Sequence, residues 1–173
     1  MDRIREIIKK YPNLWYEQEI EKKSILYKKD SSINKIYFCE KGIVRIYDVN
    51  DKGSDITNGF FFENELVIPL ISYSKKTSVM LNFHTIEDCI MQVIKIEDWE
   101  VIRKQEPIIN EILFNKSINI LLNFNKYQME SSSSNITERY YNLLKDHPTL
   151  KNVKDEYIAS YLGVTPVTLS RNK

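Results

Sequence analysis

The sequence predicts an α+β fold in which a jelly-roll-like β-roll is followed by a long dimerisation helix and a C-terminal helix-turn-helix. Three observations indicate this order. Short β-rich runs alternate with turn residues between positions 25 and 94, an apolar pattern with helical spacing begins at Pro107, and the end of the chain resembles two short helices around Gly163. Many short strands at regular spacing favour a roll or sandwich over an α/β sheet.

The N-terminal segment is expected to be helical up to about residue 20. Ile4, Ile7 and Ile8 share one helical face, and Pro12 interrupts the segment. The β-rich runs that follow cover residues 25–27, 36–39, 43–47, 59–62, 78–83 and 89–94. Turn residues at 29–32 and 50–53 separate some of them. These runs are the predicted strands of the roll.

The segment from 107 to 130 is predicted to form one long helix that mediates dimerisation. It is apolar on more than one side, through Ile108, Ile112, Phe114, Ile118, Leu121, Leu122 and Met129. One domain cannot easily cover two apolar faces of a helix, so the second face is expected to contact a partner. The alternative is a wholly buried helix in a monomer.

Residues 131–135, four serines and an asparagine, are expected to be a polar hinge that leads into a helix over 137–145. The predicted domains are therefore the N-terminal helix and sensing roll over 1–106, the dimerisation helix over 107–130, and a hinge with helix-turn-helix over 131–173.

The C-terminal residues satisfy the local requirements of a helix-turn-helix. Ile158 and Leu162 lie four residues apart on one face, and Gly163 can adopt the left-handed conformation that ends a helix. Thr165 is suited to an N-cap and Pro166 to the first helical position. Leu169 would face inward, leaving Pro166, Val167, Ser170 and Arg171 outward. An unrelated helical hairpin would share part of this pattern.

Composition limits the class of protein. The 173 residues are 42% hydrophobic and 28% charged, as in an ordinary globular domain, and the net charge of +1 excludes a histone-like binder. No apolar segment is long enough to span a membrane and the N-terminus lacks a signal-peptide pattern, so a cytoplasmic location is expected. Cys39 and Cys89 are expected to be buried small hydrophobic residues.

The order of elements resembles that of the cyclic-AMP receptor protein (CRP/FNR) family of transcription regulators over nearly the whole chain. The resemblance is carried by residues 41–47 at the first hairpin, 63–66 at the ligand segment, 86–89 before a core strand, 138–140 at the start of the last domain, and the helix-turn-helix. It implies a cyclic-nucleotide-binding-type β-roll, a homodimer through helix 107–130, a palindromic DNA operator as partner, and no enzymatic activity.

The resemblance also implies where a ligand would bind, at Asn64, Glu65, Leu66, Lys76, Thr77 and Ser78. In the family's cassette a glutamate accepts from the ribose hydroxyl and an arginine pairs with the cyclic phosphate. Here Glu65 matches the glutamate, but Asn64 replaces a glycine and Thr77 stands at the arginine position. Losing such a phosphate contact costs roughly 2–5 kcal/mol. Cyclic AMP is therefore not expected to bind tightly, whereas another small effector is possible.

Two lysines lie near the cassette, and the chain also contains two cysteines and two histidines. Lys75 and Lys76 are either substitutes for the missing arginine or solvated loop lysines, and a lysine does not reproduce the bidentate fork. The cysteines, with His84 and His147, do not supply the ligand cluster of the family's iron–sulfur or haem sensors, so no metal site is predicted.

By the same resemblance, DNA would be contacted by Thr165, Pro166, Val167, Thr168, Ser170, Arg171 and Lys173. Arg171 matches a family arginine, and a bidentate contact to guanine is worth about 1–3 kcal/mol of discrimination. Pro166 and Val167 replace polar readers, which favours apolar contact with a thymine methyl. The sequence ends at Lys173 with no β-wing, so either the recognition helix is very short or the chain is truncated.

The sequence bears on three candidate functions. A dimeric DNA-binding transcription regulator is favoured by Arg171 and the intact turn. A degenerate sensor or interaction module that no longer binds DNA is the alternative, favoured by Pro166 and Val167. An enzyme is the poorest interpretation, because the sequence contains no nucleophile elbow, glycine-rich phosphate loop or zinc-spaced histidine pair.

Overall fold

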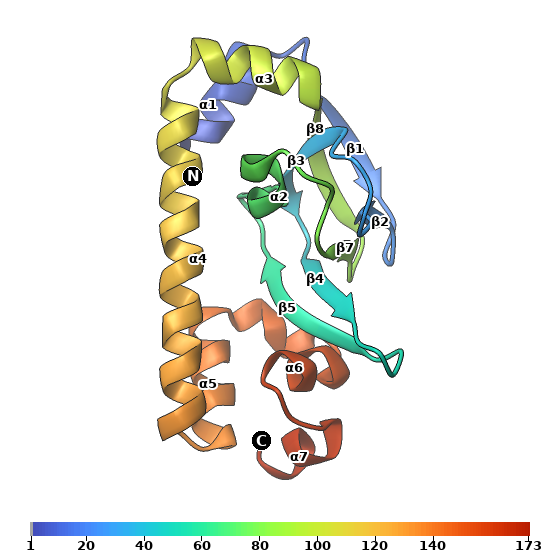
Figure 1. Ribbon diagram of the computed structural model, residues 1–173, viewed down its shortest axis with the longest axis vertical. Coiled ribbons are helices and arrows are strands. Elements are labelled where there is room, and N and C mark those ends of the chain that lie inside the picture. The colour runs from blue at the N-terminus through green and yellow to red at the C-terminus, as the bar shows by residue number, and fades with distance from the viewer. Residues whose placement is uncertain (1) are drawn as a thin grey trace. The chain divides into compact units, whose positions relative to one another are not determined.

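The computed structural model describes residues 2–173, without the side chains of residues 2 and 131–133. It is an α+β protein whose elements can be followed along the chain in Figure 1. The elements are α1 (Asp2–Lys10), β1 (Tyr16–Ile20), β2 (Ile25–Tyr27), β3 (Lys35–Lys41), β4 (Val44–Val49), β5 (Asp55–Phe61), β6 (Glu65–Val67), α2 (Leu70–Lys75), β7 (Asn82–Thr85), β8 (Cys89–Lys95), α3 (Ile96–Gln105), α4 (Ile108–Ser133), α5 (Ile136–Asp146), a 3-10 helix η1 (Pro148–Asn152), α6 (Asp155–Tyr161) and α7 (Pro166–Arg171).

The chain divides into two compact units. The first contains the residues up to Asp48 together with Gly59–Phe114, and the second contains Val49–Asn58 and Asn115–Lys173. The tip of the β4–β5 hairpin thus belongs with the C-terminal helices, while most of the strands belong to the first unit.

Two four-stranded antiparallel sheets build the roll, in the orders β1-β8-β3-β6 and β2-β7-β4-β5. Strand β3 is buried on both faces. Ile36 and Phe38 lie in a cluster with residues of α1, α3 and the start of α4, whereas Tyr37 and Cys39 lie in a second cluster with side chains of the other sheet. The first sheet is therefore covered by helices on one face and by the second sheet on the other.

Most of the predicted strands are confirmed. The runs at 25–27, 36–39 and 89–94 coincide with β2, β3 and β8, and those at 43–47 and 59–62 overlap β4 and β5. Only the end of the run at 78–83 is a strand, because β7 begins at Asn82. Cys39 and Cys89 are buried, as predicted. Burial raises the pKa of both thiols, that of Cys89 to about 12.

The prediction of a helix up to about residue 20 is wrong. Helix α1 ends at Lys10, and Tyr16–Ile20 form β1, which pairs with β8 from Tyr16–Val93 to Ile20–Cys89. Four of the five β1 side chains are exposed, so the strand is held by its backbone pairing. Its sequence therefore shows little of the alternation between apolar and polar residues that marks a strand. Helix α3 also begins before the predicted helical region, and α3 and α4 are separated at Glu106–Pro107.

The predicted hinge at 131–135 is shorter than expected, because α4 continues as a helix to Ser133. Asn135 is the N-cap of α5, and its side chain accepts a hydrogen bond from the Glu138 N–H at 2.9 Å. Helix α5 extends one residue further than the predicted range of 137–145 at each end. Among the described residues, no helix combines the length and apolarity needed to cross a membrane.

Candidate nucleic-acid interface and ligand segment

Helices α6 and α7 are joined by a tight turn at Gly163. The backbone adopts φ +69° there, and two hydrogen bonds close the end of α6: Gly163 N–H to Ser160 C=O at 3.1 Å and Val164 N–H to Ala159 C=O at 2.9 Å. This pattern is a Schellman motif, which requires a left-handed residue at the turn. The positive φ favours glycine, and a Cβ at position 163 would also lie 3.2 Å from Tyr127 Oη, a tight contact to which the tyrosine would have to adjust.

Helix α7 begins as its sequence predicts. The Thr165 hydroxyl accepts a hydrogen bond from the Thr168 N–H at 3.1 Å, and Pro166 occupies the first turn. Leu169 is fully buried, together with Ile158 and Leu162 of the preceding segment. The two helices are thereby packed through one apolar face.

The structure brings the predicted DNA-binding residues together on the exposed side of α7 and its ends. These residues are Thr165, Pro166, Val167, Thr168, Ser170, Arg171 and Lys173. Val167 is 59% exposed although apolar. Among the side chains that the structure describes, none forms a hydrogen bond or ion pair with the guanidinium of Arg171. Its charge is therefore available to a ligand.

Lys173 differs from Arg171 because it is engaged within the protein. Its ammonium group forms an ion pair with Asp155 and lies 5.6 Å from the centre of the Tyr140 ring. Asn172 donates from Nδ2 to Thr168 C=O at 2.8 Å, and its own carbonyl accepts from the Thr137 hydroxyl at 2.8 Å. Hydrogen bonds of Asn172 and the ion pair of Lys173 therefore stabilise the end of α7.

Arg139 is the main residue whose role sequence reasoning missed. Its side chain is 8% exposed, and Nη2 donates to Leu162 C=O at 2.7 Å. The guanidinium also lies 5.4 Å from the centre of the Tyr127 ring. A carbonyl at the end of α6 would otherwise lack a helical partner, so Arg139 satisfies it and links α4, α5 and α6.

The predicted ligand segment starts in a strained turn. Asn64 has φ +66°, a left-handed conformation that asparagine tolerates better than most residues. Its Oδ1 accepts from Arg5 Nη2 at 2.5 Å. The Glu65 carboxylate accepts from the Phe62 N–H at 3.0 Å, and Leu66 is buried in the core.

The second half of the ligand segment follows α2. Lys76 ends that helix in a left-handed conformation, with φ +53°, and the Thr77 N–H donates to Ser72 C=O at 3.0 Å. Lys75, Lys76, Thr77 and Ser78 are all exposed. The described part of the chain contains no group of three or more histidine, cysteine, aspartate or glutamate residues arranged to hold a metal ion.

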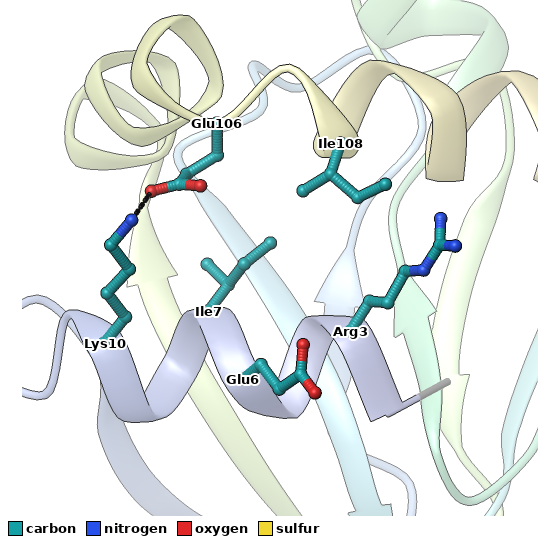
Figure 2. A pocket seen from close by; sticks show the side chains of 6 residues that line it. All are labelled: Arg3, Glu6, Ile7, Lys10, Glu106 and Ile108. Atoms are coloured by element: carbon teal, nitrogen blue, oxygen red, sulfur yellow. Dashed lines mark hydrogen bonds and ion pairs between the residues drawn. The ribbon is translucent and has the colours of Figure 1, made fainter.

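A separate hollow of about 310 Å³ lies between α1 and the α3–α4 junction and contains none of the predicted site residues. It is lined by Arg3, Glu6, Ile7, Lys10, Glu106 and Ile108 (Figure 2). Lys10 Nζ pairs with Glu106 at 2.5 Å, and hydrogen bonds from Lys10 and then Tyr11 lower the pKa of Glu106. The charges of Lys10 and Glu106 thus neutralise each other within the hollow.

Comparisons with known proteins show the fold. No protein-family model and no curated protein matches the sequence. FixK2 from Bradyrhizobium japonicum matches with a TM-score of 0.77 and 18% identity, over 91% of this chain and 82% of that chain. CLP from Xanthomonas campestris, described as a c-di-GMP-responsive global regulator, matches with a TM-score of 0.74 and 15% identity, over 96% and 88%.

A regulator assigned to the CRP/FNR family, from Eubacterium rectale, matches with a TM-score of 0.70 and 16% identity, over 94% of this chain and 78% of that chain. Two of these three proteins are described as regulators, and the structural likeness of all three confirms the predicted α+β architecture of a β-roll and helices.

Proposed function

We propose that the protein is a dimeric, DNA-binding transcription regulator of the CRP/FNR type. The observation that carries the proposal is the α6–turn–α7 geometry, which buries Leu169 and leaves an exposed row of residues ending at the unengaged Arg171. The shared fold of known transcription regulators supports the same conclusion. In this assignment, residues 131–173 form the DNA-binding domain and residues 1–106 the sensing domain.

Helix α7 acts as the recognition helix in this proposal. The Arg171 guanidinium is suited to the O6 and N7 acceptors of guanine, because it presents a planar fork of donors. Val167 and Pro166 offer an apolar surface to a thymine methyl, and Thr165, Thr168 and Ser170 offer hydroxyl groups. Lys173 would reach a phosphate only by leaving Asp155, so its contribution to affinity is small.

Dimerisation through residues 107–130 is supported by the apolar side chains that α4 leaves exposed. Phe114, Leu121, Leu122, Phe124 and Met129 are each more than half exposed. Such a concentration of exposed apolar surface on one helix is typical of an interaction site. A second copy is the expected occupant, because a two-fold dimer would present two α7 helices to a palindromic operator.

The ligand segment supports a roll that does not bind cyclic AMP tightly. Thr77 offers no charge to a cyclic phosphate, and the Glu65 carboxylate is already bonded to the Phe62 N–H. The exposed Lys75 and Lys76 are flexible point charges with no bidentate geometry. A different small effector at Asn64, Glu65, Leu66, Lys76, Thr77 and Ser78 remains compatible with this segment.

Selection of bound duplexes from a random DNA pool, followed by salt titration, tests the proposal. We expect an enriched palindrome with half-sites about one helical turn apart, and relaxed preference at one position in Arg171→Ala. Lys151→Ala is the matched control, because it removes an exposed positive charge outside α7. No enrichment, with weak binding that vanishes as salt rises, would contradict the proposal and favour a sensor module that does not bind DNA.

A further inference from the structure

The side chain of Ser160 on α6 is hydrogen-bonded to the tip of the β4–β5 hairpin. The Ser160 hydroxyl accepts a hydrogen bond from the Thr57 N–H at 2.9 Å and donates one to the Asp55 C=O at 3.1 Å. All three residues belong to the second unit, so the contact lies within one compact body.

The geometry of β5 explains why one hydroxyl can make both bonds. Strand β5 is at the edge of its sheet, where only β4 is a neighbour. Residues two apart in a strand direct their backbone groups to the same edge, so the Asp55 carbonyl and the Thr57 N–H point together. Ser160 therefore occupies the place of a neighbouring strand.

The bond to Thr57 is partly shielded from water, since Thr57 is 5% exposed and Ser160 is half-buried. A buried N–H that loses its acceptor is much less favourable than one that stays bonded. Ser160 thus contributes more to the position of the hairpin than a serine on an exposed helix face would.

We propose that Ser160 is a clasp that fastens α6 to the hairpin and sets the orientation of the α6–α7 pair before DNA is bound. This inference rests on the proposed DNA-binding function. The clasp lies on the first helix of the pair, and the Schellman turn at Gly163 then fixes α7 to α6. A helical pair held in one orientation binds with a smaller loss of conformational entropy.

The same strand also leads to the ligand segment. Beyond Thr57, β5 continues to Phe61, and the next residue, Phe62, donates its N–H to the Glu65 carboxylate at 3.0 Å. An effector that engaged Glu65 would compete with this bond at one end of the strand, while Ser160 holds the other. Strand β5 therefore runs from the residues that Ser160 hydrogen-bonds to the start of the ligand segment.

Amide hydrogen exchange tests the clasp itself. In Ser160→Ala we expect the Thr57 amide to exchange about tenfold faster, a factor that corresponds to about 1.4 kcal/mol. Ser160→Thr keeps the hydroxyl and is expected to retain protection. Ser54→Ala is the matched control, because it removes an exposed hydroxyl from the same hairpin. Unchanged protection of Thr57 in Ser160→Ala would overturn the proposal.

Duplex affinity tests the consequence of the clasp. With the duplex selected by the wild-type protein, Ser160→Ala is expected to bind about three- to tenfold more weakly, through lost pre-organisation. Ser160→Thr and Ser54→Ala are expected to bind like the wild type. Unchanged or tighter binding by Ser160→Ala would refute the clasp. If the wild-type protein selects no duplex, the proposed function fails, and the exchange of Thr57 alone decides whether the clasp exists.

Discussion

Replacing Gly163 with alanine should destabilise the second unit by an amount that can be worked out from the turn. Two effects add at this position. A non-glycine residue at φ +69° costs roughly 1–2 kcal/mol, because its Cβ approaches the following carbonyl oxygen. The new Cβ would also lie 3.2 Å from Tyr127 Oη, so the ring has to shift. With about 1 kcal/mol for this crowding, a total loss of about 2–3 kcal/mol is expected.

Gly53 provides a matched control for the backbone effect. It has φ +76°, and a Cβ there would meet no atom within 4 Å. Gly53→Ala should therefore lose only the roughly 1–2 kcal/mol of conformational strain. The difference between the two variants measures the crowding against Tyr127.

Urea unfolding at equilibrium is the assay for both variants. Tyr127→Phe should recover part of the Gly163→Ala loss, because it removes the Oη atom and keeps the ring beside Arg139. If Gly163→Ala costs no more than Gly53→Ala, and Tyr127→Phe recovers nothing, the turn is not as crowded as the argument requires.

Three other changes have defined outcomes. Arg139→Gln should lower the free energy of unfolding by about 1.5–3 kcal/mol, since a buried charged hydrogen bond to α6 is lost; equal stability in urea would contradict this. Leu121→Glu should weaken the proposed dimer by about 3 kcal/mol or more, because a carboxylate would enter an apolar interface, whereas Asn119→Glu should leave the sedimentation coefficient unchanged. Burial alone would raise the pKa of Glu100, but hydrogen bonds from Arg103 and Tyr73 lower it below the usual 4.5. Because the pKa of Glu100 is lowered by folding, its carboxylate stabilises the fold at pH above the unfolded-state pKa, and this stabilisation is lost as the pH falls through the folded-state pKa. Glu100→Gln should therefore flatten the acid limb of a plot of stability against pH. An acid limb identical to that of the wild type would contradict the pairing of Glu100 with Arg103 and Tyr73.

The parts of the fold that depend on local chemistry were predictable from the sequence. Gly163, Thr165 and Pro166 each have a conformational preference that determines the turn and the start of α7 without reference to distant residues. The strands of the roll core were also predictable, because β3 and β8 are rich in apolar and aromatic residues.

The parts that depend on distant partners were not predictable. Strand β1 has mostly exposed side chains and is defined by its pairing with β8, which lies far along the chain. Serine residues up to Ser133 continue α4 although serine is a weak helix former. The burial of Arg139 requires Tyr127 and Leu162 to approach it from two other helices. No local sequence pattern predicts the burial of Arg139, and the family resemblance indicated only that residues 138–140 begin the last domain.

The burial of β3 on both faces also determines how the roll must fold. Ile36 and Phe38 belong to one core and Tyr37 and Cys39 to the other, so neither core can close until β3 is in place. Its partner β8 begins only at Cys89, and a large loop of chain must close before the two strands pair. Such non-local pairing slows folding, whereas contacts between helices that are neighbours in sequence form quickly. Assembly of β3 with β8 is therefore expected to limit the rate at which a newly made chain reaches its native state.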